Sequence, residues 1–239
     1  MHHNLLYQHL ETQYPDLTLV CSKFGGAPDV PVSFVWPTWF DKPLGFLAQI
    51  NLQDIAPFDL HHVLPPMGLL SFFYDGLEGY NKEGNRVFWF ANTVPLARSQ
   101  AHGPNLVQTC QITSSPYLEL LHFIDGHWQE NEWREILDAT TAYNFYPERP
   151  IDSANKMLGY GDDFGRNSVV PNFNVPNGDY LKRISSIPET VDYHLLLQVD
   201  SDDRLGVMWG DAGTVNFMIH KDHLAARHFN EAQLTGTNG

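Results

Sequence analysis

Apolar residues in this chain gather in short stretches of four to eight residues that are typical of β-strands. Polar turns or prolines separate them, so we predict a strand at each stretch. The predicted strands cover residues 17–20, 46–52, 68–75, 86–90, 194–201 and 213–220. Residues 25–43 are dense in proline and glycine, and we predict an ordered loop there, because proline lacks the donor that a central strand requires.

Helical spacing of apolar residues predicts helices in three other places. Apolar positions in residues 5–14 recur roughly every third or fourth residue, and a proline closes that segment. A serine–proline pair, which is typical of a helix start, opens a predicted helical insertion at about residues 115–145. A terminal helix is predicted to begin near Asp222. Strands, then helices, then strands predict an α+β fold, rich in antiparallel sheet, in a single domain over residues 1–239.

One internal repeat is visible in the sequence. The hexapeptide FLAQIN at residues 46–51 aligns with LLLQVD at residues 195–200, and an apolar run led by glycine follows each of them. We predict an internal duplication of a β-hairpin unit over about residues 46–75 and 195–220, with the helices inserted between the halves. Chance similarity between two apolar strands is the alternative.

The repeat aligns polar residues that the strand alternation places on one face. Gln49 and Asn51 share a face of the first unit, and Gln198 and Asp200 share the equivalent face of the second. A buried amide without a hydrogen bond costs about 1–3 kcal/mol. Each glutamine therefore either ties down neighbouring loop backbone, which is the more frequent role, or converges with the other on a central ligand site. If the units pair about a pseudo-twofold axis and share one core, such a site lies between them.

Residues 200–213 hold four carboxylates in a chain that is otherwise poor in charge. A calcium loop does not fit, because Arg204 and Leu205 stand where a ligand and a glycine are needed. We favour an exposed acidic turn whose Trp209 folds back onto the core. Acid–base or metal-holding chemistry is the alternative, and its candidate groups are Asp200, Asp202 and Asp211.

Twelve histidines raise the question of a metal site. The best spacing is that of His220, Asp222 and His223, but zinc needs three or four converging ligands and a helical pair four residues apart is absent. We expect surface histidines with no metal and no cofactor, and whether these three residues bind metal stays open. The sequence also lacks a P-loop, a Gly-x-Ser-x-Gly elbow and a cysteine with an arranged histidine.

Composition narrows the class of partner. The 239 residues include 14 Lys and Arg against 28 Asp and Glu, which gives a net charge of −14, while 43% of residues are hydrophobic. These values exclude a disordered acidic tail, and the negative charge argues against nucleic acid and anionic membranes and favours basic partners. Cys21 and Cys110 are expected to be reduced thiols. With neither a signal-peptide pattern nor an apolar run of membrane length, we expect a cytoplasmic protein.

Several motifs together resemble the YwqG-like family, a bacterial group of domains of unknown function. They occupy residues 22–28, 36–37, 43–52, 64–73, 196–202, 208–213 and 222–229, so the resemblance extends from residue 22 to about residue 230. A further family element is similar to residues 156–160, although Asn155 stands where a histidine normally precedes the lysine, and Gly161 replaces a proline. The resemblance implies a β-rich α+β domain and supplies no activity, cofactor or catalytic residue.

We therefore expect a cytosolic binding or interaction protein without catalysis, whose partner is a basic protein, as in an immunity-type role. The alternative is a hydrolase or other enzyme that acts on a small polar substrate through the carboxylates of residues 200–211. In that alternative the glutamines orient the substrate and a tryptophan forms an apolar wall. The candidate ligand-binding residues are Trp36, Gln49, Asn51, Gln198, Asp200, Asp202, Trp209 and Asp211.

Overall fold

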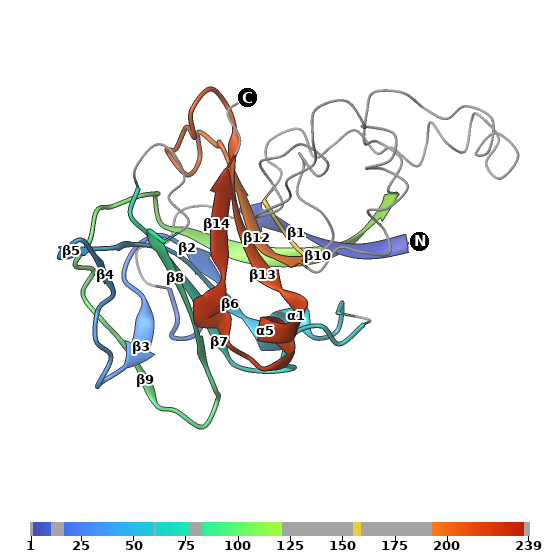
Figure 1. The fold of residues 1–239 in the computed structure, drawn as a ribbon, viewed down its shortest axis with the longest axis horizontal. Helices are drawn as coiled ribbons and strands as arrows, with labels where there is room; N and C mark the ends of the chain where they lie inside the picture. Colours follow the sequence, from blue (N-terminus) through green and yellow to red (C-terminus); the bar gives the residue numbers. More distant parts are fainter. Residues whose placement is uncertain are drawn as a thin grey trace, which may run out of the picture.

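The computed structural model describes residues 2–10, 17–59, 61–76, 83–120, 155–158 and 193–236. Its elements are, in chain order (Figure 1), β1 (His2–Leu10), β2 (Lys23–Phe24), β3 (Asp29–Pro31), β4 (Thr38–Trp39), β5 (Lys42–Pro43), β6 (Gly45–Asn51), α1 (Leu52–Ile55), β7 (Leu69–Tyr74), β8 (Asn85–Phe90), β9 (Leu96–Arg98), β10 (Cys110–Leu120), β11 (Lys156–Met157), β12 (Tyr193–Asp200), β13 (Thr214–His220), α5 (Lys221–Ala225), the 3₁₀ turn η1 (Phe229–Glu231) and β14 (Gln233–Gly236).

A ten-stranded sheet organises this part of the chain. Its strands follow the order β14-β13-β12-β11-β1-β10-β2-β6-β7-β8, and each pairing described within it is antiparallel. Two small sheets, β3–β9 and β4–β5, lie outside it. The long pair β1–β10 occupies the middle of the order, and Figure 1 shows the two strands running side by side. The protein is thus a β-rich domain with few and short helices among the described residues.

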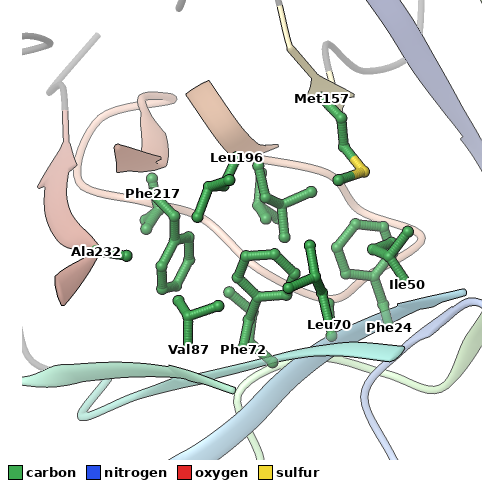
Figure 2. Packing of buried hydrophobic residues seen from close by; sticks show 14 of the residues in the cluster. Phe24, Ile50, Leu70, Phe72, Val87, Met157, Leu196, Phe217 and Ala232 are labelled. Atoms are coloured by element: carbon green, nitrogen blue, oxygen red, sulfur yellow. The ribbon is translucent and has the colours of Figure 1, made fainter. Parts of the chain in front are cut away.

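The two ends of the sheet face each other across the hydrophobic core. Phe72 of β7 and Phe217 of β13 contact each other, with ring centroids 5.1 Å apart. Figure 2 shows Leu196 and Phe217 on one layer, opposite Leu70, Phe72 and Val87 on the other. These five side chains are buried and belong to one continuous cluster. Burial of apolar surface between the two layers is therefore the main stabilising contribution in this part of the fold.

Most of the predicted strands are confirmed. The strands β6, β7, β8, β12 and β13 match the five longer apolar stretches to within one residue at each end. The terminal helix is also confirmed, since α5 begins at Lys221, next to Asp222. The proline- and glycine-rich residues 25–43 form an ordered loop that includes only the short strands β3, β4 and β5. Short apolar runs were therefore sufficient to predict these five longer strands, whereas β4, β5 and β14, which also pair with a sequence neighbour, were not predicted.

Two helix predictions are wrong over the residues that the structure describes, and one interaction explains both. Strand β1 replaces the first part of the helix predicted over residues 5–14, and β10 runs through Ser115 and Pro116, where the insertion was predicted to begin. The two strands pair with each other over nine residues. This ladder provides backbone hydrogen-bond partners for both segments, and it overrides their local helical preference. The rest of the predicted insertion, from residue 121 to about 145, lies outside the described residues.

The strand predicted at residues 17–20 is also wrong. Val20 has a left-handed backbone with φ 65°, and its N–H donates a 2.8 Å hydrogen bond to Oδ2 of Asp29. This side-chain acceptor replaces a ladder partner, so the chain turns here instead of extending.

Candidate functional site

Gln49 joins the main sheet to the loop that covers its outer face. Its side-chain oxygen accepts a 2.9 Å hydrogen bond from the backbone N–H of Asp29. Its amide nitrogen donates to Oδ2 of Asp29 and to the carbonyl of Cys21, both at 2.8 Å. Both amide protons are therefore used inside the protein. Gln49 has the loop-tying role that was the favoured interpretation of its sequence position.

Asp29 is the centre of this buried polar cluster. Arg98 donates from Nε to Oδ1 of Asp29 at 2.6 Å, and the whole aspartate is fully buried. Burial by itself raises the pKa of Asp29, but hydrogen bonds from Arg98 and Gln49 and the charge of Lys23 outweigh it, so the pKa is lowered. Asp29 is thus an ionised carboxylate that is already neutralised by its neighbours, which suits a structural clamp.

Lys23 is the second buried charge of the cluster. Its ammonium donates a 2.5 Å hydrogen bond to the carbonyl of Ala27, and burial lowers its pKa despite the nearby carboxylate of Asp29. A lysine with a lowered pKa can act as a nucleophile when substrate reaches it. Only 1% of Lys23 is exposed, so in this conformation the ammonium is closed to a substrate.

The second half of the sheet repeats this strand register. Lys156 of β11 pairs with Gln198 of β12 in the way that Lys23 of β2 pairs with Gln49 of β6, and all four residues are buried. Each hairpin also has an irregularity in register just before its glutamine. It lies between Leu195 and Leu197 in β12 and between Phe46 and Ala48 in β6. Counted inward from either end of the sheet, β7 and β6 occupy the same places as β13 and β12.

The last residues of β6 and β12, the two strands that carry the glutamines, each donate a matching hydrogen bond from the backbone N–H. The backbone N–H of Asn51 donates to the Ser22 hydroxyl, and the backbone N–H of Asp200 donates to Oδ1 of Asn155, both at 2.9 Å. Asn51 also caps α1, because its side chain accepts a 3.1 Å hydrogen bond from the N–H of Gln53. The polar residues that end the two strands therefore have backbone partners.

The structure does not bring Gln49 and Gln198 together. Four strands separate β6 from β12 in the sheet, and the neighbours of each glutamine, such as Ala48 and Val199, belong to the shared core. Strand alternation then turns the two amides toward opposite outer faces. The shared core that we predicted between the units is present, but the meeting of the matched amides near an axis is wrong. The prediction considered only how the apolar faces of the units pack together, and this does not determine whether the glutamines point toward the core or away from it.

The acidic segment of residues 200–213 is a turn in which Asp200 and Asp202 accept hydrogen bonds from residues of the same turn. Both carboxylate oxygens of Asp202 accept hydrogen bonds from Arg204, from its backbone N–H and its guanidinium, at 2.8–3.1 Å. Asp200 accepts a 2.9 Å hydrogen bond from the N–H of Ser201. Asp211 is exposed, as expected for such a turn, but Asp202 is buried. The structure therefore places these carboxylates along a turn and does not line either described cavity with them.

Trp209 folds back onto the core as predicted. Its side chain is buried, and its ring lies 6.0 Å from that of Tyr74. Ser201 fixes the backbone at Trp209, because its hydroxyl donates a hydrogen bond to the carbonyl of Gly213 and accepts one from the N–H of Trp209, both at 2.8 Å. Trp209 thus holds the acidic turn against the sheet.

Trp36 anchors the loop of residues 31–41, which we call the 31–41 loop. Its indole nitrogen donates a 2.8 Å hydrogen bond to the carbonyl of Leu44. Its ring meets that of Phe73 edge-on at 5.2 Å, and Phe34 stacks on the same Phe73 at 5.8 Å. These contacts attach the loop to the outer face of the sheet, so its backbone has a defined path.

The same loop presents three apolar side chains to solvent, on either side of these anchors and between them. Val32 is 90% exposed, Val35 is 83% exposed and Phe40 is 80% exposed. Scattered exposed apolar residues are common on proteins, but three of them on one anchored loop distinguish this loop from the rest of the described chain. The 31–41 loop is the candidate functional site. Sequence reasoning found the pinned aromatic loop but not which side chains point outward.

The tip of the 31–41 loop has an unusual backbone. Phe40 and Asp41 connect β4 to β5 as a two-residue hairpin turn, with φ values of 44° and 60°. Such turns favour asparagine and glycine, and a bulky residue in the left-handed region is strained. The chain thus has an exposed phenylalanine at a position where asparagine or glycine would make the folded protein more stable.

The histidines near α5 do not gather a ligand set. Nδ1 of His220 accepts a hydrogen bond from the N–H of Asp222 at 3.3 Å and so caps α5, while the ring of His223 lies 6.0 Å away. A search for three or more histidine, cysteine or acidic side chains that could hold a metal finds none in the described ranges. The same ranges contain no helix with the length and apolar character needed to cross a membrane.

A comparison with protein families identifies the chain. A family model described as a domain of unknown function, DUF1963, matches residues 22–236. The chain belongs to this family. In this DUF1963 domain the match covers β2 to β14, and therefore both lysine–glutamine pairs and the 31–41 loop, while β1 precedes it. The predicted resemblance to a family of unknown function is confirmed at this level. No curated protein matches the sequence.

Proposed function

We propose that this DUF1963 domain is a non-catalytic binding protein that presents the 31–41 loop to a basic protein partner. The observation that carries the proposal is the exposure of Val32, Val35 and Phe40 on a loop held in place by Phe34 and Trp36. Aromatic side chains presented on a rigid support lose little conformational entropy on binding, and they commonly supply much of the binding energy.

Net charge supports a basic partner. A protein of charge −14 attracts cationic surfaces and repels nucleic acids and anionic membranes. Long-range attraction of this kind raises the association rate and decreases with salt. An immunity-type role, in which the domain neutralises a basic toxin, is the version that best uses such a field. The two free cysteines, Cys21 and Cys110, support a reducing, cytoplasmic location.

A hydrolase that uses the acidic turn is the second candidate from the sequence. We rank it lower because Asp202 is bonded by Arg204, and because Gln49, which would orient the substrate, is bonded by Asp29. An enzyme of this kind needs at least one of these groups to be open to a substrate.

The test is recovery of a partner by the purified full-length protein from the native host, at low and high salt. We expect a basic protein at low salt, its loss at high salt, and its loss at any salt when Val35→Ser and Phe40→Ser are combined. Met208→Ser is the matched control, because Met208 is 63% exposed and lies outside the loop. Recovery of no protein by the unaltered domain, or equal loss for the control, would remove the proposal.

We also infer that the domain is an internal duplication and that it belongs to the YwqG-like branch suggested by its motifs. The duplication is supported by the matched pairs Lys23–Gln49 and Lys156–Gln198 and by the shared order of β2-β6-β7-β8 and β11-β12-β13-β14. Under this inference the outer covering of the two halves has diverged. The 31–41 loop covers one half only, which would leave partner binding to that half.

A further inference from the structure

A cavity lies between the turn that follows α1 and the end of α5, and it is lined by other residues than those of the 31–41 loop. Figure 1 shows these two helices side by side at one end of the fold. The cavity has a volume of about 350 Å³, which is within the range of small-molecule sites. Leu64, Pro65 and Leu224 give it apolar walls.

Asp59 places a fixed carboxylate in the wall. The residue is only 4% exposed, and its oxygens accept hydrogen bonds from the backbone N–H groups of Val63 at 3.0 Å and Leu64 at 2.7 Å. Each carboxylate oxygen has two lone pairs, so these bonds leave acceptor capacity unused. The turn thus holds Asp59 in position while the carboxylate can still accept hydrogen bonds from a ligand.

Arg227 places a cation in the same wall. Three other arginines of the described chain bind inside the protein: Arg86 to backbone carbonyls, Arg98 to Asp29 and Arg204 to Asp202. The side chain of Arg227 makes no hydrogen bond or ion pair to any residue in the described ranges, whereas its backbone N–H donates to the carbonyl of Leu224. Its guanidinium lies over the ring of Trp89, 5.1 Å from the centroid, which orients it without satisfying its donors.

The two opposite charges share a cavity but do not bind each other. No nitrogen of Arg227 lies within 4.0 Å of an oxygen of Asp59. Arg227 and His62, which also lines the cavity, have left-handed backbones with φ 59° and 51°. Strain of this kind tends to gather where backbone shape serves binding. A ligand that carries both charges would satisfy Arg227 and Asp59 together.

We propose that this cavity binds a small zwitterion of the α-amino acid class with an apolar side chain. Arg227 receives the carboxylate as a fork of parallel N–H donors, and Asp59 receives the ammonium group. Leu64 and Leu224 contact the apolar side chain. The inference is independent of the proposed protein partner, because no residue of the 31–41 loop lines the cavity.

The test is calorimetric titration of the full-length protein with L-leucine and L-phenylalanine. Two analogues of leucine each lack one charge: 4-methylpentanoate has no ammonium group and 3-methylbutylamine has no carboxylate. We expect saturable binding of at least one amino acid, and affinities for the analogues of leucine lower by about tenfold or more, since each loses a charged hydrogen-bond set. Absence of saturable binding of both amino acids, or equal binding of an analogue, would overturn the proposal.

Two variants distinguish a specific contact of Arg227 with the amino acid from a general electrostatic attraction between protein and ligand. Arg227→Gln is expected to weaken amino acid binding by about tenfold or more. Lys221→Gln removes the same charge from the neighbouring helix α5, but Lys221 does not line the cavity, so binding should be unchanged. Thermal unfolding of both variants checks that they fold. Equal weakening by the two substitutions, or none by Arg227→Gln in a folded protein, would contradict the assignment of Arg227.

Discussion

Gln49 and Asp29 hold each other through two hydrogen bonds, one from the Asp29 backbone N–H at 2.9 Å and one to its carboxylate at 2.8 Å. The pair joins β6 of the main sheet to β3 of a small outer sheet. Both residues are fully buried, so water does not replace these hydrogen bonds if they are lost. The amide of Gln49 is therefore one anchor of the covering loop, in addition to Trp36 and Phe34.

The first prediction concerns that amide. Gln49→Leu preserves the approximate size of the side chain but leaves the Asp29 N–H and the Cys21 carbonyl without their partner. We expect the free energy of unfolding, measured with urea, to fall by about 1–3 kcal/mol. Gln53→Leu is the control, because Gln53 is exposed and its side chain makes no such bond, and it should change stability by less than about 0.5 kcal/mol. Equal effects would mean that Gln49 is not a clamp.

The second prediction concerns acid stability. The pKa of Asp29 is lowered in the folded protein, since bonds from Arg98 and Gln49 and the charge of Lys23 outweigh burial. The ionised form therefore stabilises the fold above the unfolded pKa of about 3.9, and this contribution is lost as pH falls through the lower folded pKa. Urea unfolding at a series of pH values from neutral down should show a steeper acid loss for the unaltered protein than for Asp29→Asn. Parallel curves would contradict this role.

The longer strands that pair with a sequence neighbour could be predicted. The apolar runs of β6 and β7 are joined by residues 52–68, so each strand and its partner lie in one stretch of sequence. In contrast, β1 pairs with β10 more than a hundred residues later, from His2 opposite Leu120 to Leu10 opposite Ile112. Local features of β10, above all its serine and proline, indicate a helix start, and only the distant partner overrides them.

Part of the polar cluster around Gln49 and Asp29 could be predicted from the sequence. A glutamine inside the apolar run of β6 required a partner, and this argument correctly favoured loop backbone for Gln49. The partner itself is Asp29, which is twenty residues away, and its counter-ion Arg98 follows 69 residues later. No spacing rule connects residues at such separations. The exposed residues of the 31–41 loop were not visible either, because burial in a loop depends on which side chains the sheet covers.

The third prediction tests the contact between the two layers. Phe72 and Phe217 meet edge-on in the middle of the core. Each single alanine substitution should lower the free energy of unfolding by about 3–5 kcal/mol. The double variant should lose less than the sum by about 0.5–1.5 kcal/mol, because the ring–ring contact is then counted once. Urea unfolding of the four proteins gives this coupling energy.

A matched cycle serves as the control for this coupling. Phe46 is also buried in a strand of the same sheet, but it packs in a separate cluster with Leu44 and Phe73. The effects of Phe46→Ala and Phe217→Ala should therefore add within about 0.5 kcal/mol. Additive effects for Phe72 and Phe217 as well would mean that the two layers are not in direct contact there. If the single variants prove too unstable, Phe→Leu substitutions give the same comparison.

The last prediction separates stability from binding at the loop tip. Phe40 has φ 44° in a two-residue turn, where the left-handed conformation costs a bulky residue about 1–2 kcal/mol, and its 80% exposure means that little burial offsets this cost. Phe40→Asn should therefore raise the free energy of unfolding by about 0.5–1 kcal/mol while it weakens partner capture. Val35→Asn is the matched control, since Val35 is equally exposed without a left-handed backbone and should not gain stability. A loss of stability in Phe40→Asn would show that the side chain supports the fold, and the argument for a side chain maintained for binding would then fail.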